Sequence, residues 1–441
     1  MKASIVSLGC AKNTVDTEIM LGLLQKEGYT LTRQIQEAQV LIINTCGFIT
    51  PAKEESIRHI LNSAQLKKTG CCQVLLVAGC LAQRYGQELL NEMPEVDGLI
   101  GTGAVTEIGS IVRAALKGEK VCACPYPAYI YHSDLPRLRV TPFYTAYVKI
   151  AEGCNQHCAF CVIPLIKGSY RSRKMEDVEA EVALLINKGV KEINLIAQDT
   201  TSYGKDLYGE YCLSKLLRRL AKVTPEKVWL RLLYGHPASF TPELLTVIAE
   251  ENKICRYLDL PLQHISDPML KRMNRQKKGV DTRSLIKQIR NTMPGLTLRT
   301  TFIVGFPGET EDHFQELLAF MREACFERVG IFKYSPEEGT AAESMPDQVP
   351  GEIKEERFHR AMLLQREISY RKNKEQAGKE VTVLVEGKKN GYYYGRGEAD
   401  APEVDGQVFF TTQGKKVAVG EFRRVRILKA KNYDLIGKLS F

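Results

Sequence analysis

The feature that most constrains the fold is a regular alternation of short apolar segments with helix-like segments through most of the 441 residues. From residue 145 onward the alternation repeats about six times over ~200 residues, which favours a full or partial α/β barrel. The chemistry of such a barrel lies at the C-terminal ends of its strands. We expect strands at 145–150, 192–197, 228–232, 257–260, 297–304 and 329–334, and helices at 175–188, 214–222 and 242–250.

A separate unit of the same kind occupies residues 1–124. Strands at 3–7, 40–43 and 74–78, with helices at 17–26 and about 52–68, predict a Rossmann-like α/β domain. Each of these strands ends near a cysteine, namely Cys10, Cys46 or Cys80. Ligands collect beyond the carboxyl ends of strands in open parallel sheets, so the three cysteines can converge. The alternative is that they are small buried core residues. The other cysteines of the domain, Cys71, Cys72, Cys122 and Cys124, do not end predicted strands.

Two further segments complete the predicted organisation. Residues 125–142 are rich in proline and lack periodicity, which is typical of a linker. A charged, helix-like segment at 353–376 leads into short alternating β runs, which predict a small antiparallel β-barrel at the C-terminus. The predicted domains are therefore 1–124, 143–374 for the central barrel, and 375–441.

The strongest chemical signal is the sequence C-x3-C-x2-C formed by Cys154, Cys158 and Cys161, directly after the first barrel strand. Three thiolates can hold three irons of a cubane cluster and leave the fourth iron open, whereas electron-transfer ferredoxins usually supply four cysteines. An open iron implies a ligand from a substrate or cofactor. A zinc site and three structural cysteines are the alternatives.

Composition limits the setting in which this chemistry operates. Thirteen cysteines in a chain of this size predict metal or thiolate chemistry rather than a disulfide framework. The formal net charge of +9 favours an anionic partner such as RNA or a ribonucleoprotein. No apolar run approaches the ~18 residues that span a bilayer, and the N-terminus lacks a signal-peptide pattern. We therefore expect a cytoplasmic protein with no membrane contact.

The segment 154–161 resembles the signature of radical S-adenosylmethionine (SAM) enzymes. The resemblance implies that the open iron binds the amino and carboxylate groups of SAM, and that reduction releases a 5′-deoxyadenosyl radical. It also implies that Phe160 packs near the adenine. Residues 301–309 resemble the adenine-binding motif of the same enzymes, in which Gly305 allows a close backbone approach.

Polar residues at the ends of barrel strands complete the predicted cofactor site. Gln198, Arg231 and Gln263 are expected to contact the SAM carboxylate, its ribose or the substrate. The alternative for each is a hydrogen bond already satisfied inside the barrel mouth.

Segments 9–13, 44–48 and 79–83 resemble the three conserved blocks of methylthiotransferases, and the similarity extends over essentially the whole chain. Segments 167–173, 197–204 and 258–266 are similar to the branch that modifies the twelfth protein of the small ribosomal subunit. The resemblance implies methylthiolation at the β-carbon of an aspartate, with two SAM molecules and two 4Fe-4S clusters. Cys10, Cys46 and Cys80 would hold the second cluster.

The resemblance also implies partners. The tail resembles a TRAM domain, which implies possible contact with ribosomal RNA, and the reaction requires an electron donor. A radical is needed because the C–H bond beside the carboxylate is too weakly acidic for a side-chain base. The alternatives are a methylthiotransferase acting on adenosine in tRNA and a non-catalytic iron–sulfur RNA-binding protein. The latter does not explain why both cysteine triads lack a fourth ligand.

Overall fold

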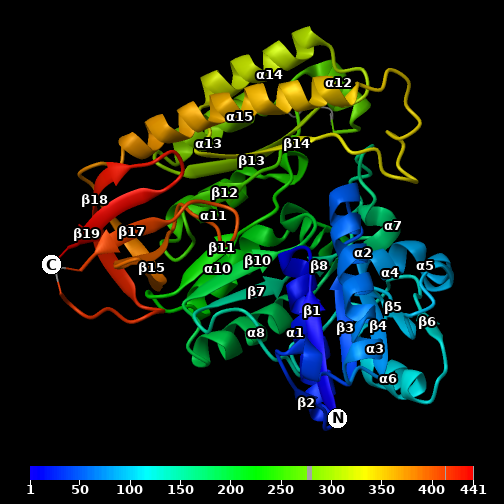
Figure 1. The fold of residues 1–441 in the computed structure, drawn as a ribbon. Helices are drawn as coiled ribbons and strands as arrows, with labels where there is room; N and C mark the ends of the chain where they lie inside the picture. Colours follow the sequence, from blue (N-terminus) through cyan, green and yellow to red (C-terminus); the bar gives the residue numbers. More distant parts are fainter. Residues whose placement is uncertain (276–280, 413, 441) are drawn as a thin grey trace.

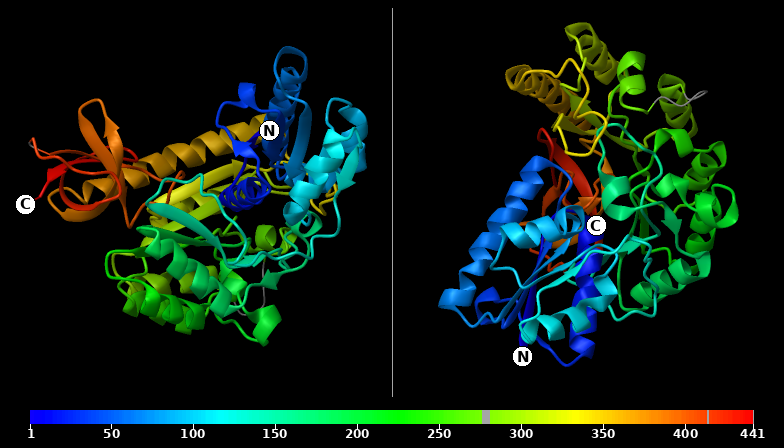
Figure 2. Two further views of the ribbon diagram at one scale, coloured as in Figure 1. Left: turned by 90° about the horizontal axis from the view of Figure 1, so that it is seen from below. Right: turned by 90° about the vertical axis from the view of Figure 1, so that its right-hand side faces the viewer.

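The computed structural model describes residues 1–275, 281–412 and 414–440, which form three parts along the chain (Figure 1). A parallel sheet with helices comes first, a central open barrel of parallel strands follows, and a small closed barrel ends the chain. The predicted α/β class and the order of the three parts are confirmed. Figure 2 shows that the first and last parts pack at different sides of the central barrel.

The N-terminal sheet is six-stranded and parallel throughout, in the order β2-β1-β3-β4-β5-β6. Its strands are β1 (Lys2–Ser7), β2 (Thr30–Leu31), β3 (Val40–Thr45), β4 (Val74–Gly79), β5 (Gly98–Ile100) and β6 (Val121–Ala123). Its helices are α1 (Ala11–Lys26), η1 (Ile35–Glu37), α2 (Thr50–Ala64), α3 (Leu66–Thr69), α4 (Cys80–Tyr85), α5 (Gln87–Glu92), η2 (Val105–Glu107) and α6 (Ile108–Leu116). β3 and β4 are buried over their whole length, as expected for strands covered on both faces.

Helix α1 joins the N-terminal domain to the central barrel. It begins at Ala11, well before the predicted start at residue 17. Val15 and Ile19 share one apolar core with Tyr147 and Ile196 of the barrel. Because the helix lies between two domains, polar residues of its first turns are buried as well as the apolar ones. A search for apolar periodicity therefore misses the first turns of the helix.

The central barrel has six parallel strands in two three-stranded sheets, β7-β10-β11 and β12-β13-β14. An isolated parallel bridge between Leu230 and Ile254 connects the two sheets, so the predicted partial barrel is confirmed. The strands are β7 (Thr145–Lys149), β10 (Glu192–Ile196), β11 (Trp229–Leu232), β12 (Tyr257–Asp259), β13 (Thr297–Val304) and β14 (Arg328–Lys333). The helices are α7 (Ile163–Lys167), α8 (Met175–Asn187), η3 (Thr200–Ser202), α9 (Lys205–Tyr208), α10 (Leu213–Val223), η4 (Pro237–Ser239), α11 (Pro242–Glu250), α12 (Asp267–Arg272), α13 (Thr282–Thr292) and α14 (Glu311–Ala324). A short hairpin of β8 (Ala151–Glu152) and β9 (Arg171–Ser172) lies at the mouth of the barrel.

Helix α15 (Gly351–Lys374) leads from the central barrel to the closed C-terminal barrel, in the order β15-β16-β17-β19-β18. Its strands are β15 (Glu380–Lys389), β16 (Tyr392–Gly397), β17 (Val408–Thr411), β18 (Phe422–Ala430) and β19 (Leu435–Leu439). The predicted small antiparallel β-barrel is confirmed, with one exception in its pairing, because β17 and β19 run parallel. Five strands cannot alternate in direction all the way around a closed barrel, so one parallel pair is unavoidable.

The predicted linker, residues 125–142, contains no helix or strand but is docked against both neighbouring domains. Tyr131 is buried in the core that α1 shares with the barrel. Arg137 forms ion pairs with Glu18 of α1 and Glu181 of α8. The segment therefore fixes the N-terminal domain against the barrel. In the described part of the chain, no helix is long and apolar enough to cross a membrane.

Candidate active site

Cys10, Cys46 and Cys80, here called the strand-end triad, lie at one edge of the N-terminal sheet. They follow β1, β3 and β4, which are adjacent and parallel, so their carboxyl ends meet. Cys10 caps the N-terminus of α1 and Cys80 is the first residue of α4. The predicted convergence of these strand ends is present in the fold.

Two glycines allow the backbone to pack closely at this edge. Gly79 has φ +92°, and a Cβ there would lie 2.3 Å from Asn44 Oδ1 and 2.7 Å from the carbonyl oxygen of Thr45. A Cβ on Gly9, at φ +87°, would lie 2.9 Å from Cys46 Cβ. Both positions therefore require glycine, for conformation and for space.

Asn13 ties the strand ends together, and sequence reasoning gave it no role. Its amide nitrogen donates to the carbonyls of Leu8 at 3.1 Å and Thr45 at 2.8 Å. Its Oδ1 accepts a hydrogen bond from Cys80 Sγ at 3.7 Å. The available signal was its place three residues after Cys10, which puts it on the same face of a helix.

The thiols of the strand-end triad are packed closely enough to affect one another. The pKa of Cys80 is raised to about 12, mainly by burial, with Lys167 opposing the rise and the neighbouring Cys46 and Cys10 contributing to it. Burial likewise raises the pKa of Cys46. These thiols are protonated at neutral pH without a metal, so metal binding releases protons here.

Cys154, Cys158 and Cys161, here called the loop triad, lie in the loop between β8 and α7. The Cys154 amide donates to the carbonyl of Gly168 at 3.2 Å, and the Cys161 amide to that of Cys158 at 3.0 Å. Arg275 Nη1 donates to Cys158 Sγ at 3.3 Å. Burial raises the pKa of Cys154 to about 11 and that of Cys161 to about 12, and in each the other cysteines add to the effect.

The two triads fit iron–sulfur clusters better than single metal ions. Among the described residues, no three His, Cys, Asp or Glu side chains are gathered around one point closely enough to hold an ion. A zinc ion needs its ligands on one centre, whereas each thiolate of a cubane binds a different iron. Arg275 at the loop triad and Lys167 at the strand-end triad supply positive charge suited to an anionic cluster.

Four buried charged residues, here called the chamber charges, form one cluster of ion pairs from α1, β7, β8 and α7. Lys149 Nζ is 2.5 Å from Asp16 Oδ1 and also pairs with Glu152. Lys167 Nζ is 3.3 Å from Asp16 Oδ2 and 3.8 Å from Glu152 Oε2. Asp16 comes from α1, Glu152 precedes Cys154 by two residues, and all four side chains are at most 8% exposed.

Lys167 links the chamber charges to the strand-end triad. Burial alone would lower its pKa, but Asp16, Glu152, Cys80 and Cys10 raise it above its usual value. Glu152 contacts a residue beyond the end of β10, because its Oε2 accepts a hydrogen bond from Gln198 Nε2 at 3.1 Å. Buried polar contacts therefore run from Lys167, whose pKa the strand-end cysteines affect, through Glu152 to Gln198 at the barrel mouth.

The structure brings four of the predicted cofactor residues to the mouth of the barrel. Gln198 follows β10, and Gln263, at φ +73°, bridges to Phe302 of β13. The Oε1 atoms of both glutamines are buried, and neither accepts a hydrogen bond from a described residue. Buried acceptors of this kind are rare in folded proteins and are suited to a ligand.

Phe160 and Gly305 lie close together on the same side. The Phe160 ring packs edge-on against Phe306, with 6.4 Å between centroids. Gly305 has φ +71°, and its amide donates to Glu309 Oε2 at 2.6 Å. Gly305 is buried, and a Cβ there would lie 2.3 Å from Cγ of Lys354, so the side chain of Lys354 covers this glycine.

Arg231, the remaining predicted cofactor residue, does not lie at the mouth of the barrel. It is fully buried, its Nε is 3.1 Å from Glu192 Oε1, and its Nη1 donates to the carbonyl of Glu398 in the C-terminal barrel at 2.6 Å. Its position in the strand is opposite Asn194, inside the sheet rather than beyond its end. The predicted contact with SAM has no support in this geometry, and the observed role of Arg231 is to join two domains.

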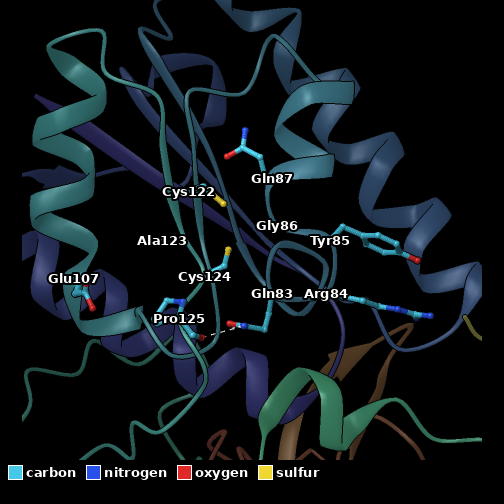
Figure 3. Close-up of a pocket in the computed structure, with 10 residues that line it drawn as sticks. All are labelled: Gln83, Arg84, Tyr85, Gly86, Gln87, Glu107, Cys122, Ala123, Cys124 and Pro125. Atoms are coloured by element: carbon cyan, nitrogen blue, oxygen red, sulfur yellow. Dashed lines mark hydrogen bonds between the residues drawn. The ribbon is translucent and has the colours of Figure 1, made fainter. Parts of the chain in front are cut away.

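The N-terminal domain has a fourth strand end with a cysteine, which the sequence prediction missed. β6 ends at Ala123, so Cys124 directly follows a strand too short to be recognised from apolar periodicity. Cys124 and Cys122 line an open cavity of about 660 Å³ at the edge of the domain (Figure 3). Cys124 Sγ donates to the carbonyl of Ala82 at 3.3 Å, so it lies behind α4 rather than with the triad.

Comparisons with known families match all three parts of the chain. Residues 2–101 match the uncharacterized protein family UPF0004, residues 148–321 the radical SAM superfamily, and residues 377–439 the TRAM domain. A radical SAM methyltransferase, TsrM from Kitasatospora setae, solved with cobalamin and a [4Fe-4S] cluster, has a similar fold. The TM-score is 0.58 at 14% identity, over 78% of this chain and 76% of that one. The fold, the loop triad and these matches define a radical SAM enzyme.

Full-length relatives narrow the class. The ribosomal protein uS12 methylthiotransferase RimO of Pelotomaculum thermopropionicum is 54% identical over 441 residues, covering 99% of each chain. RimO of Desulforamulus reducens is 52% identical over 440 residues, with the same coverage. The chain belongs to the RimO family of methylthiotransferases.

Proposed function

We propose that this enzyme adds a methylthio group to the β-carbon of an aspartate in ribosomal protein uS12, the twelfth protein of the small subunit. Two molecules of SAM are consumed, one as the methyl donor and one as the source of the radical. The names of the full-length relatives support this assignment, as does the match to the radical SAM family. The acceptor protein lies in the cytoplasm, and an electron donor is required.

The observation that carries the proposal is that Cys80 of the strand-end triad shares a buried apolar cluster with Val162 and Ile166, which follow Cys161 of the loop triad. Transfer of sulfur to a carbon radical requires that both centres reach one substrate. Lys167 interacts with the strand-end triad, and Glu152 pairs with Lys167 and lies two residues before Cys154. Two unrelated metal centres would not need to pack against each other in this way.

The residues of the chain have distinct parts in the proposed reaction. When bound, the cluster on Cys154, Cys158 and Cys161 supplies the electron that cleaves SAM, and the cluster on the strand-end triad supplies the sulfur site. The position of the Phe160 ring supports contact with the adenine, which is proposed to involve Gly305 as well, and the free amide oxygens of Gln198 and Gln263 support contact with polar groups of SAM. The chamber charges pair with one another and so hold together the elements that carry the two triads.

The C-terminal barrel is proposed to contact ribosomal RNA during substrate recognition. The match to the TRAM domain supports this role. The barrel is attached to the catalytic barrel by the buried ion pair of Glu192 with Arg396 and by the hydrogen bond from Arg231 to the carbonyl of Glu398, which give it a fixed orientation.

The proposal is tested by incubating reconstituted, reduced enzyme and SAM anaerobically with uS12 and, separately, with tRNA. Mass spectrometry should find one added methylthio group on an aspartate of uS12 and none on tRNA. Modification of tRNA alone would overturn the choice of substrate. Absence of 5′-deoxyadenosine from every reaction would overturn the radical mechanism and favour a non-catalytic iron–sulfur protein.

A further inference from the structure

Lys12 is a buried cation whose partners in the protein do not include a carboxylate. It lies in the first turn of α1, two residues after Cys10, and is 8% exposed. Its Nζ lies over the Tyr234 ring, 3.0 Å from the centroid. Among residues 1–275, 281–412 and 414–440, no Asp or Glu oxygen comes within ion-pair distance of Lys12 Nζ.

The carboxylates near Lys12 are already paired with other groups. Asp259 Oδ1 is 2.9 Å from Arg299 Nη1, and its Oδ2 accepts the backbone N–H of Tyr234 at 3.0 Å. Asp16 and Glu152 are shared by Lys149 and Lys167. These carboxylates face Arg299, Lys149 and Lys167, and Arg299 is also 3.7 Å from Asp405, so none of them pairs with Lys12.

A buried ammonium that has no carboxylate partner favours binding of an anion. Removing an ammonium group from water costs several kcal/mol, even after the protein relaxes around it. Contact with an aromatic ring returns only about 0.5–2 kcal/mol. The Tyr234 ring therefore holds the ammonium in place without neutralising it, and one anionic group can enter with a net gain.

Lys12 lies where the two halves of the site meet. Its backbone belongs to the N-terminal domain beside Cys10, whereas Tyr234 directly follows the end of β11 in the central barrel. An anion held at Nζ therefore lies between the strand-end triad and the barrel mouth. In an aspartate side chain, the reacting β-carbon is bonded directly to the carboxylate carbon, so fixing the carboxylate also fixes the β-carbon.

We propose that Lys12 binds the side-chain carboxylate of the substrate aspartate and thereby selects an acidic side chain and positions its β-carbon. This inference rests on the proposed function and adds the residue that recognises the acceptor. A nucleobase acceptor has no negative charge to offer at this point, so Lys12 also favours a protein substrate over tRNA.

The test measures binding by the cluster-loaded enzyme of two peptides from uS12, one with the modified aspartate and one with asparagine in its place. The wild-type enzyme should bind the aspartate peptide more tightly. Lys12→Met should weaken binding of the aspartate peptide about 10- to 100-fold and leave binding of the asparagine peptide unchanged. Lys12→Arg, which keeps the charge, should retain the preference for aspartate.

Two controls separate this role from others. Lys205→Met removes an exposed lysine near another ring, that of Tyr211, outside the chamber, and should change neither affinity. Iron content of Lys12→Met should equal that of the wild type. Loss of iron would overturn the proposal by showing that Lys12 serves the cluster, and equal weakening of both peptides would overturn it by showing a purely structural role.

The outcome also distinguishes this inference from the proposed function. Modification of uS12 by the wild type, together with unchanged aspartate preference in Lys12→Met, would overturn the Lys12 assignment alone. Failure of the wild type to modify uS12 would overturn both.

Discussion

The loop triad and the strand-end triad each offer three thiolates, but the chain builds them in opposite ways. The loop triad is contained in residues 154–161, and backbone hydrogen bonds within the loop and to Gly168 shape it. The strand-end triad collects residues 10, 46 and 80 from three strands and depends on the register of the whole sheet. The first is therefore a local feature of sequence and the second a product of the fold, and the two should respond differently to change.

The largest expected effect is on activity, because a cysteine removed from one triad should abolish a different step from a cysteine removed from the other. Cys154→Ala removes a ligand of the loop triad, so formation of 5′-deoxyadenosine should fall to the level seen without enzyme. Cys80→Ala should preserve 5′-deoxyadenosine formation but abolish methylthiolation. Each variant should lose about half of the roughly eight irons expected for two cubanes. Iron and sulfide analysis with chromatography of the nucleoside products measures both effects.

The two variants also test whether the triads are independent. If Cys80→Ala lost all its iron and Cys154→Ala did so too, the triads would form a single cooperative unit, contrary to the local character of the loop.

Stability can be reduced without touching either triad at the buried ion pairs between barrel and C-terminal domain. Glu192 is fully buried, and its Oε2 is 2.6 Å from Arg396 Nη2. Burial opposes ionisation, but Arg396 and Arg231 outweigh it and lower the pKa of Glu192 from 4.5 to about 2. A carboxyl whose pKa is lower in the folded than in the unfolded protein stabilises the fold at any pH above its pKa in the unfolded chain. This contribution is lost as the pH falls from about 4.5 towards 2.

Glu192→Gln should therefore lower the free energy of unfolding at neutral pH by roughly 3 kcal/mol, and the difference from wild type should shrink below about pH 4. Urea unfolding at a series of pH values measures this. Glu250→Gln is the matched control, because its exposed pair with Arg218 should contribute less than about 1 kcal/mol. Both variants should keep all their iron, and loss of iron from Glu192→Gln would show that the triads depend on the position of the C-terminal domain.

The contrast between the triads also explains what could be read from the sequence. The bounds of α11 and β13 agree with prediction because apolar periodicity marks them clearly. β5 and β6 were missed because three residues are too few to show a period. The loop triad could be proposed from the spacing of its cysteines, and the strand-end triad from the positions of its cysteines at predicted strand ends. The distance in sequence between Cys10, Cys46 and Cys80 did not matter once the strands were assumed to be parallel neighbours.

The residues of the site that the sequence prediction missed are mainly buried polar ones. Asn13, Lys12 and Lys167 are buried in the site, although residues of these types are usually exposed. The roles of Lys12 and Lys167 depend on Tyr234 and Asp16, more than 100 residues away, and that of Asn13 depends on strand ends brought to it by the sheet. The contacts of Arg231 with Glu192 and with the backbone of the C-terminal barrel could not be read from the sequence for the same reason.

A smaller effect should come from the glycine that precedes Cys80. Gly79→Ala forces a Cβ to within 2.3 Å of Asn44 Oδ1 at φ +92°, so the strand end must shift. We expect a loss of about 1–3 kcal/mol in stability and depletion of iron from the strand-end triad alone. Gly28→Ala is a close control, since Gly28 has φ +90° but a Cβ there would meet nothing within 4 Å. It should cost only backbone strain and keep all iron, and equal iron loss in both variants would refute the packing argument.

The smallest effect is expected at a cysteine that belongs to neither triad. Cys71 is exposed, and its Sγ donates to the carbonyl of Gln36 at 3.2 Å. A serine hydroxyl can donate to the same carbonyl, so Cys71→Ser should change the free energy of unfolding by less than about 0.5 kcal/mol. Iron content and 5′-deoxyadenosine formation should equal those of the wild type. A loss of iron in this variant would mean that the metal is not confined to the two triads. Cys71 would then be a further ligand, and the comparison of a local site with a site assembled by the sheet would be incomplete.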